Sequence, residues 1–157
     1  MKTVYMDRLS HSEPVSVFVR NINIKWAGAS VYSMPVSDKN AVYQNIADKY
    51  DVHFIFDDEK PELHFYSVPW VEVFAIDSCG GCFSSVEDLP GFDSKSPVVY
   101  IDGNKKVFWA AEDFEQFIGN LINCKENMKP YSEVRVFDTK EDAMKIFEFI
   151  EVKTDEG

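Results

Sequence analysis

The sequence predicts an α+β fold, in which helices pack on a twisted, mainly antiparallel sheet. Three observations support this: β-branched and aromatic runs of strand length, few amphipathic helical stretches, and turn signals between neighbouring strands. Single helices between long strand runs do not give the regular alternation of a doubly wound parallel sheet. At 157 residues, 45% of them hydrophobic, the chain has enough apolar mass for one domain over residues 1–157.

The N-terminal part, residues 1–36, is predicted to form strands. Apolar and polar residues alternate there in two runs, which favours a hairpin formed by residues 15–19 and 22–24. Apolar residues then recur at helical spacing, which predicts a short helix over residues 40–50. Ser37 or Asp38 would be its N-cap.

The central part is predicted to contain four strands, separated by an acidic turn, a proline and a glycine pair. Pro69 separates the second of these strands from the third, because a proline has no N–H to donate to a central ladder. Gly80 and Gly81 predict a turn, because glycine adopts positive φ at little cost. The four strands are expected at residues 52–56, 63–68, 71–76 and 82–86.

The C-terminal part carries the clearest local signals. Asp102 and Gly103 form the turn signal of a hairpin between residues 98–101 and 106–109, after a loop at residues 87–96. A full apolar stripe predicts a helix over residues 114–122. A strand at residues 134–137 and a helix capped by Thr139 follow, and residues 151–157 read as a frayed tail.

The charge of the chain bears on its partners. The formal net charge is −11, from 16 Lys and Arg against 27 Asp and Glu, with no basic run. Nucleic acids are bound by clusters of Lys and Arg, so we expect no nucleic-acid partner. The same charge repels anionic membranes and favours encounter with a basic protein. The alternative is that the acidity only maintains solubility.

The hydropathy pattern predicts a cytoplasmic protein without a membrane anchor. No apolar run approaches the roughly 20 residues of a membrane span, and residues 1–11 have no apolar stretch of signal-peptide length. The three cysteines, Cys79, Cys82 and Cys124, cannot all pair within the chain, which also fits a reducing compartment.

The pair Cys79 and Cys82 has the Cys-x-x-Cys spacing of redox and zinc sites. A thioredoxin-like pair must open a helix, and Pro90 and Gly91 follow too soon to leave room for one. A zinc site would have to recruit its other ligands from residues with no second close pair, namely Cys124, His11, His53 and His64. The interpretation we favour is two small residues flanking a glycine turn.

Motifs that activate a nucleophile are missing from the sequence. It contains no Gly-x-Ser-x-Gly, no His-Glu-x-x-His and no phosphate-binding glycine loop. Acidic pairs such as Asp57-Asp58 could bind a divalent metal, but such pairs arise by chance in a chain this acidic. We therefore expect no enzymatic activity, no cofactor and no metal site.

The segment over residues 65–121 resembles the SUKH superfamily, which contains Smi/Knr-type cell-wall regulators and bacterial toxin-immunity proteins. The resemblance rests on strand runs around an Asp-Ser-x-Gly-Gly turn, then a hairpin and an amphipathic helix. With the helix at residue 40 counted, it covers residues 40–122, whereas the expected N-terminal helices have no counterpart. The runs that carry it are residues 65–69, 74–78, 80–83, 97–102, 107–111 and 114–118.

The resemblance implies a non-catalytic domain that binds and neutralises a cognate toxin, many of which are basic enzymes. The alternatives are a regulatory or scaffolding protein that binds another partner or a small ligand, and a thiol oxidoreductase using Cys79 and Cys82. For the tryptophans the favoured reading is partial burial in the core. Trp70, beside a strand break, is the best candidate among them for an interface residue, because Trp is enriched at binding hot spots. The full set of candidate contact residues is Asp57, Asp58, Glu59, Trp70, Asp77 and Ser78.

Overall fold

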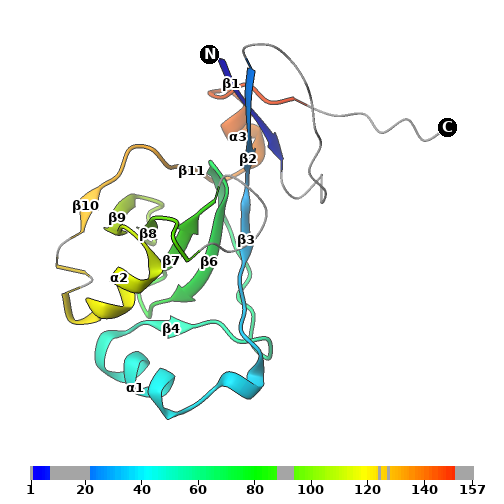
Figure 1. Cartoon of the computed structure of the whole chain (residues 1–157). Coiled ribbons are helices and arrows are strands. Elements are labelled where there is room, and N and C mark those ends of the chain that lie inside the picture. The colour runs from blue at the N-terminus through cyan, green and yellow to red at the C-terminus, as the bar shows by residue number, and fades with distance from the viewer. Residues whose placement is uncertain (1, 8–21, 88–93, 124, 127, 151–157) are drawn as a thin grey trace.

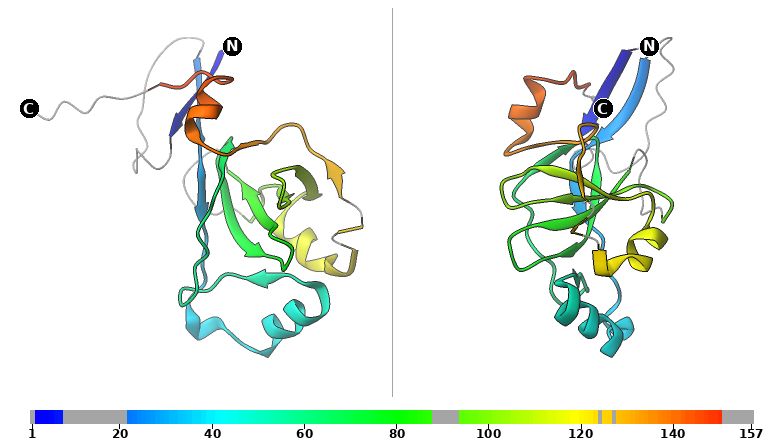
Figure 2. Two further views of the ribbon diagram at one scale, coloured as in Figure 1. Left: turned by 180° about the vertical axis from the view of Figure 1, so that it is seen from behind. Right: turned by 90° about the vertical axis from the view of Figure 1, so that its left-hand side faces the viewer.

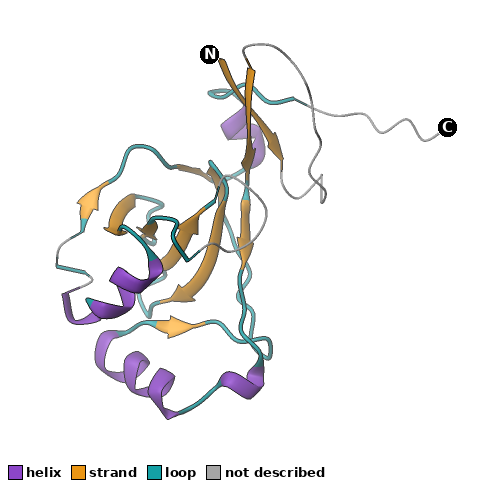
Figure 3. Cartoon of the chain, viewed as in Figure 1, coloured by secondary structure: helices purple, strands orange, loops and turns teal. Residues whose placement is uncertain are grey.

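The computed structural model describes residues 2–7, 22–87, 94–123, 125, 126 and 128–150. It is an α+β fold, as predicted, and its helices and strands are shown in Figures 1 and 3. The strands are β1 Lys2–Asp7, β2 Ile22–Ala27, β3 Ala29–Val31, β4 His53–Phe54, β5 Tyr66–Val68, β6 Val71–Ile76, β7 Cys82–Val86, β8 Val98–Ile101, β9 Val107–Ala111, β10 Lys129–Pro130 and β11 Arg135–Phe137. The α-helices are α1 Ala41–Tyr50, α2 Phe114–Gly119 and α3 Lys140–Met144, and two 3-10 helices are η1 Val36–Asp38 and η2 Leu121–Asn123.

The main sheet is twisted and mainly antiparallel. Its strand order is β10-β9-β8-β7-β6-β3, with β4 also paired to β6. All neighbours in it are antiparallel except β3 and β6, which run parallel. This confirms the predicted fold class and the predicted strands at residues 71–76, 82–86 and 98–101.

The two faces of the main sheet are covered differently. On one face, Phe74 and Phe83 pack against Phe117 of α2, and side chains of α1 join the same cluster. Figure 2 shows α2 beside the strands and α1 at the end of the sheet next to β4. The opposite face is covered by Leu63 and Phe65 from one extended segment and by residues of another, near Val134. No helix contributes to that second cluster among the described residues.

A smaller unit of strands and one helix lies beside the main sheet. β1 and β2 pair in parallel, and β5 pairs antiparallel with β11. Ala143 of α3 packs there against Ala27, Tyr66 and Val68. Residues 15–19, predicted as one strand of an N-terminal hairpin, lie outside the described residues, as do residues 88–93 of the predicted loop, Cys124 and the tail 151–157.

Helix starts follow local sequence, with one correction. Asp113 and Thr139 cap α2 and α3 by accepting from Gln116 N and Asp142 N, which confirms the cap predicted at Thr139. The predicted cap of α1 is wrong: Ser37 and Asp38 belong to η1, and Asn40 Oδ1 accepts from Val42 N at 2.9 Å. A 3-10 turn uses the residues that would otherwise have capped the helix.

Two predicted strands are shorter than expected. The run at residues 52–56 keeps only β4, and the run at residues 63–68 keeps only β5. β5 lies in a different sheet from β6, although the two are separated by only Pro69 and Trp70. The apolar pattern shows which side chains face inward, but a strand also needs a partner of the same length. No helix in the described part of the chain is long and apolar enough to cross a membrane.

Candidate functional site

The turn between β6 and β7 is organised around the carboxylate of Asp77. Asp77 Oδ1 accepts from Cys79 N at 2.9 Å and from Gly81 N at 2.7 Å. Gly80 has φ +85°, where an L side chain is strained. At Gly81, a Cβ would lie 2.2 Å from the hydroxyl of Tyr100. The predicted turn is confirmed. Its two glycines are needed for different reasons: the backbone conformation at Gly80 and the lack of space at Gly81.

The other oxygen of Asp77 joins the turn to two distant segments. Oδ2 accepts from the Tyr100 hydroxyl and from Lys125 Nζ, the latter at 3.0 Å. Burial alone would raise the pKa of Asp77, but the hydrogen bonds from Tyr100, Lys125 and Gly81 keep that pKa below its usual value. Burial and the neighbouring carboxylate raise the pKa of Tyr100. Asp77 is therefore a charged anchor of the fold.

Asp51 ties the end of α1 to the same turn. It is the C-cap residue of α1, in left-handed conformation, and its Oδ2 accepts from Ser78 Oγ at 2.7 Å. Oδ1 lies 2.9 Å from His53 Nε2, and Oδ2 lies 3.7 Å from Lys125 Nζ. The hydrogen bonds from Ser78, together with His53 and Lys125, lower the pKa of Asp51 to about 2, against the raising effect of burial.

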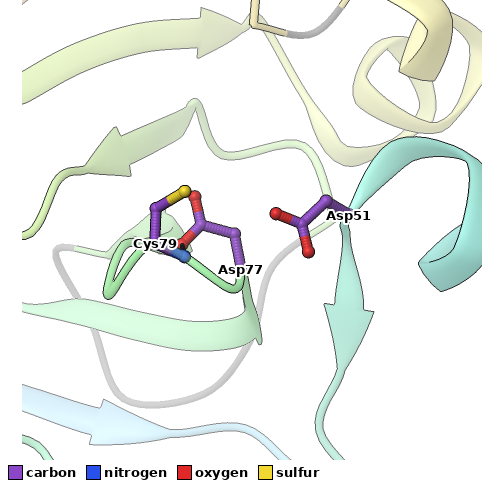
Figure 4. Close-up of side chains that lie close together, drawn as sticks. All are labelled: Asp51, Asp77 and Cys79. Atoms are coloured by element: carbon purple, nitrogen blue, oxygen red, sulfur yellow. Dashed lines mark hydrogen bonds between the residues drawn. The ribbon is translucent and has the colours of Figure 1, made fainter.

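These residues include the atoms best placed to hold a metal in the described part of the chain. Asp51, Asp77 and Cys79 lie close together (Figure 4). Each offers one possible ligand atom, and these three atoms lie within 4.8 Å of one another. Lys125 already bridges the two carboxylates, so its ammonium supplies the positive charge that a metal would bring. We assign the cluster to fixing the turn. The sequence contained no signal for Asp51 or Lys125, because they meet Asp77 only through the tertiary fold.

The two cysteines differ in environment. Cys79 is exposed in the turn, whereas Cys82 is buried at the start of β7. Burial raises the pKa of the Cys82 thiol to about 11. The described residues after Cys79 form a turn and a strand, and no helix begins there to stabilise a thiolate. The described residues around Cys79 therefore differ from the helix start that a thioredoxin-like pair has.

The acidic turn, which we define as residues 57–59, is held by its backbone with its side chains exposed. Asp57 N donates to Met34 O at 2.9 Å, and Glu59 N donates to Phe56 O at 3.1 Å. Ser33 Oγ donates to Asp57, and Phe56 anchors the turn in the core at 6% exposure. These three predicted contact residues thus lie together on the surface.

One cation from a distant part of the chain, Lys39, contacts the acidic turn. Lys39 Nζ lies 3.3 Å from Asp58 Oδ2 and 5.5 Å from the centroid of the Phe56 ring. For Asp57 and Glu59, no ion pair is recorded within the described ranges. One lysine therefore offsets only part of the charge of the turn.

Two of the predicted contact residues are wrong as surface residues. Trp70 is 0% exposed, and its Nε1 donates to Ser30 Oγ at 2.8 Å. Asp77 is 7% exposed and uses both carboxylate oxygens inside the turn. Trp70 packs in one buried cluster with Met6 of β1 and Trp26 of β2, and Trp70 N donates to Trp26 O. The core burial that the sequence favoured for the tryptophans is therefore confirmed for Trp70, and its candidate role at an interface is wrong. Of the residues in the Asp77 turn, Ser78 does lie on the surface.

The predicted turn between β8 and β9 is present, but the residue with positive φ is not its glycine. Asp102 Oδ1 accepts from Asn104 N and Lys106 N, both at 2.9 Å. Lys105, rather than Gly103, takes the positive φ of 65°. Gly103 is needed for space, because a Cβ there would lie 3.2 Å from the carbonyl oxygen of Cys79. The two glycine turns are therefore packed against each other.

Comparison of the chain with protein-family models, with curated proteins and with solved structures finds no match. The resemblance to the SUKH superfamily accordingly stays a prediction.

Acid is expected to loosen the Asp77 turn through Asp51. Because the folded-state pKa of Asp51 is depressed to about 2, its contribution to stability is complete above its unfolded pKa, roughly 3.9. That contribution is lost as the pH falls from about 4 to about 2. Chemical denaturation of the wild type and of Asp51→Asn across this range should show a smaller loss of unfolding free energy for the variant. Parallel pH profiles would contradict this role.

Proposed function

We propose that this chain is a non-catalytic protein-binding domain that holds a basic partner against its acidic turn. The observation that carries the proposal is the turn itself: three consecutive carboxylates, exposed and held by backbone hydrogen bonds, in a chain of net charge −11. A surface already fixed in its binding geometry loses little conformational freedom on association. Complementary charge accelerates the encounter with a basic partner.

A cavity behind the acidic turn adds support for a basic ligand group. It has a volume of about 350 Å³ and is lined by Phe54, Phe56, Asp58 and Glu59 among others. Lys39 already places its ammonium over the Phe56 ring at the edge of this cavity. An arginine or lysine side chain of a partner that displaced Lys39 would meet the same aromatic face and the same carboxylates.

The partner class that we propose is a basic toxin, which the chain would neutralise in the manner of an immunity protein. The acidity and the resemblance to the SUKH superfamily support this class independently of each other. The experiment is co-expression with the toxin candidate encoded by the adjacent gene, followed by gel filtration. Protection together with a stable complex is expected, and failure of both would exclude an immunity role with that candidate.

Charge reversal of the acidic turn tests the surface. The triple variant Asp57→Lys, Asp58→Lys, Glu59→Lys should bind the adjacent gene product at least about tenfold more weakly, mainly through slower association. The control reverses three exposed acidic residues elsewhere, Glu112, Glu126 and Glu141, and changes the net charge equally. Kinetic binding measurements give the association rate and the affinity of both variants, and so show whether the position of the charges matters. Equal weakening would mean that only net charge matters, which would remove the acidic turn from the proposal.

A further inference from the structure

Residues 61–65 form an extended segment that has no strand partner in the described part of the chain. They follow the acidic turn and lead directly into β5. Their side chains alternate: Leu63 and Phe65 are half-buried against the second face of the main sheet, whereas Glu62 and His64 are exposed. Among the described residues, no recorded hydrogen bond involves a backbone N–H or C=O of residues 61–65. Their side-chain alternation is that of a strand, but the pairing is missing.

The reason lies in the partner of β5. β11 runs antiparallel to β5, with Phe137 opposite Tyr66. Continuing the ladder would place Asp138 and Thr139 opposite residues 65 and 64. Thr139 instead caps α3, so the chain leaves the sheet at that point. Residues 61–65 therefore extend beyond the end of β11, and their backbone groups pair with no described segment.

A largely apolar cavity lies next to the unpaired segment. It has a volume of about 340 Å³ and is bounded on one side by residues 61–65. Ile76, Cys82 and Ile101 of the main sheet lie among its opposite wall. Lys105 also borders it, with its ammonium 2.7 Å from Asp138 Oδ1. The cavity offers a place for an apolar side chain of a strand added to this edge.

The charges along the segment indicate which kind of strand would pair there. Glu62 adds a fourth exposed carboxylate to those of residues 57–59, against one exposed cation, Lys60, between them, so the stretch keeps a net negative charge. A basic extended peptide would bring opposite charges to this edge. A second copy of this chain is disfavoured, because pairing the same edge to itself would bring two acidic turns to one interface.

We propose that residues 61–65 are a β-addition site, at which an extended segment of the basic partner pairs with the backbone next to β5. Apolar side chains of that segment enter the cavity, and its basic side chains meet Glu62 and the acidic turn. Such strand addition takes affinity from main-chain hydrogen bonds and specificity from alternate side chains. The inference rests on the proposed function and adds the mode of binding.

The test uses the whole protein and a short synthetic peptide in which valine and lysine alternate. We expect saturable binding, measured by fluorescence anisotropy, and slower amide hydrogen exchange at residues 62–65 in the complex. Two further peptides are N-methylated, one at every valine amide and the other at every lysine amide. Because alternate amides of a strand point to opposite edges, only one of these two should bind about tenfold more weakly.

A third peptide, with glutamate in place of lysine, controls for charge and should not bind. Absence of saturable binding by the valine–lysine peptide, equal affinities of the two N-methylated peptides, or protection of other amides would overturn the inference. Hydrogen exchange in the complex with the adjacent gene product separates the two proposals. If binding depends on the acidic turn but residues 62–65 stay unprotected, strand addition is wrong while the proposed function remains.

Discussion

Replacing Asp77 with alanine is expected to lower the free energy of unfolding by about 3–5 kcal/mol. The change removes the acceptor for two backbone N–H groups and leaves the Tyr100 hydroxyl and the Lys125 ammonium without their shared carboxylate. The side chain of Asp77 is fully shielded from solvent, so water cannot take its place without rearrangement of the turn. Urea denaturation of the variant and the wild type measures the difference.

Two matched variants make this result interpretable. Asp77→Asn keeps an oxygen for Cys79 N and Gly81 N but loses the charge opposite Lys125, so its loss should be smaller than that of alanine. Asp57→Ala removes an exposed carboxylate of the acidic turn and should change stability by less than about 1 kcal/mol. An alanine variant at Asp77 as stable as the one at Asp57 would show that the buried network does not hold the turn.

Trp70→Ala should destabilise the protein by about 3–5 kcal/mol and leave the affinity of the folded protein for its partner unchanged. Trp70 is fully buried between Met6 and Trp26, and its indole N–H bonds Ser30 Oγ. Removing the ring leaves a large cavity where β2 meets the start of β6. Thermal or urea unfolding gives the stability, and titration with the partner under conditions where the variant is folded gives the affinity.

Trp70→Phe is the control, because it keeps an aromatic ring while removing the donor to Ser30. We expect it to fall between wild type and alanine in stability. A Trp70→Ala protein that stays as stable as wild type but no longer binds the partner would restore Trp70 to the interface. That outcome would contradict the burial of Trp70 on which its exclusion from the binding surface depends.

Elements specified by short-range chemistry were predictable from the sequence. Thr139 caps its helix, and the β8–β9 hairpin forms around Asp102, because caps and tight turns depend on residues a few positions apart. The acidic turn was also found correctly as an exposed feature, since three adjacent carboxylates are rarely buried. Before α1, several residues that can cap a helix follow one another closely. The two that we predicted, Ser37 and Asp38, belong to η1, and Asn40 is the cap.

Contacts between distant segments were not predictable from the pattern. Lys125 lies 48 positions from Asp77, and nothing near either residue indicates the other. The run at residues 63–68 was predicted as one strand, yet pairing stops at Tyr66 because β11 ends at Phe137. For Trp70 the sequence favoured the core without showing its neighbours, and only the fold places it against Met6 and Trp26.

The sequence by itself determined the α+β class, the acidity, and most turns and caps, because these follow from composition and from interactions within a few residues. Only the tertiary structure decided that Asp77 is an internal anchor, that Trp70 packs against Met6 and Trp26, and that residues 61–65 have no partner strand among the described residues. The physical reason is that burial and strand pairing depend on which distant segments meet in space, and side-chain periodicity does not encode that choice.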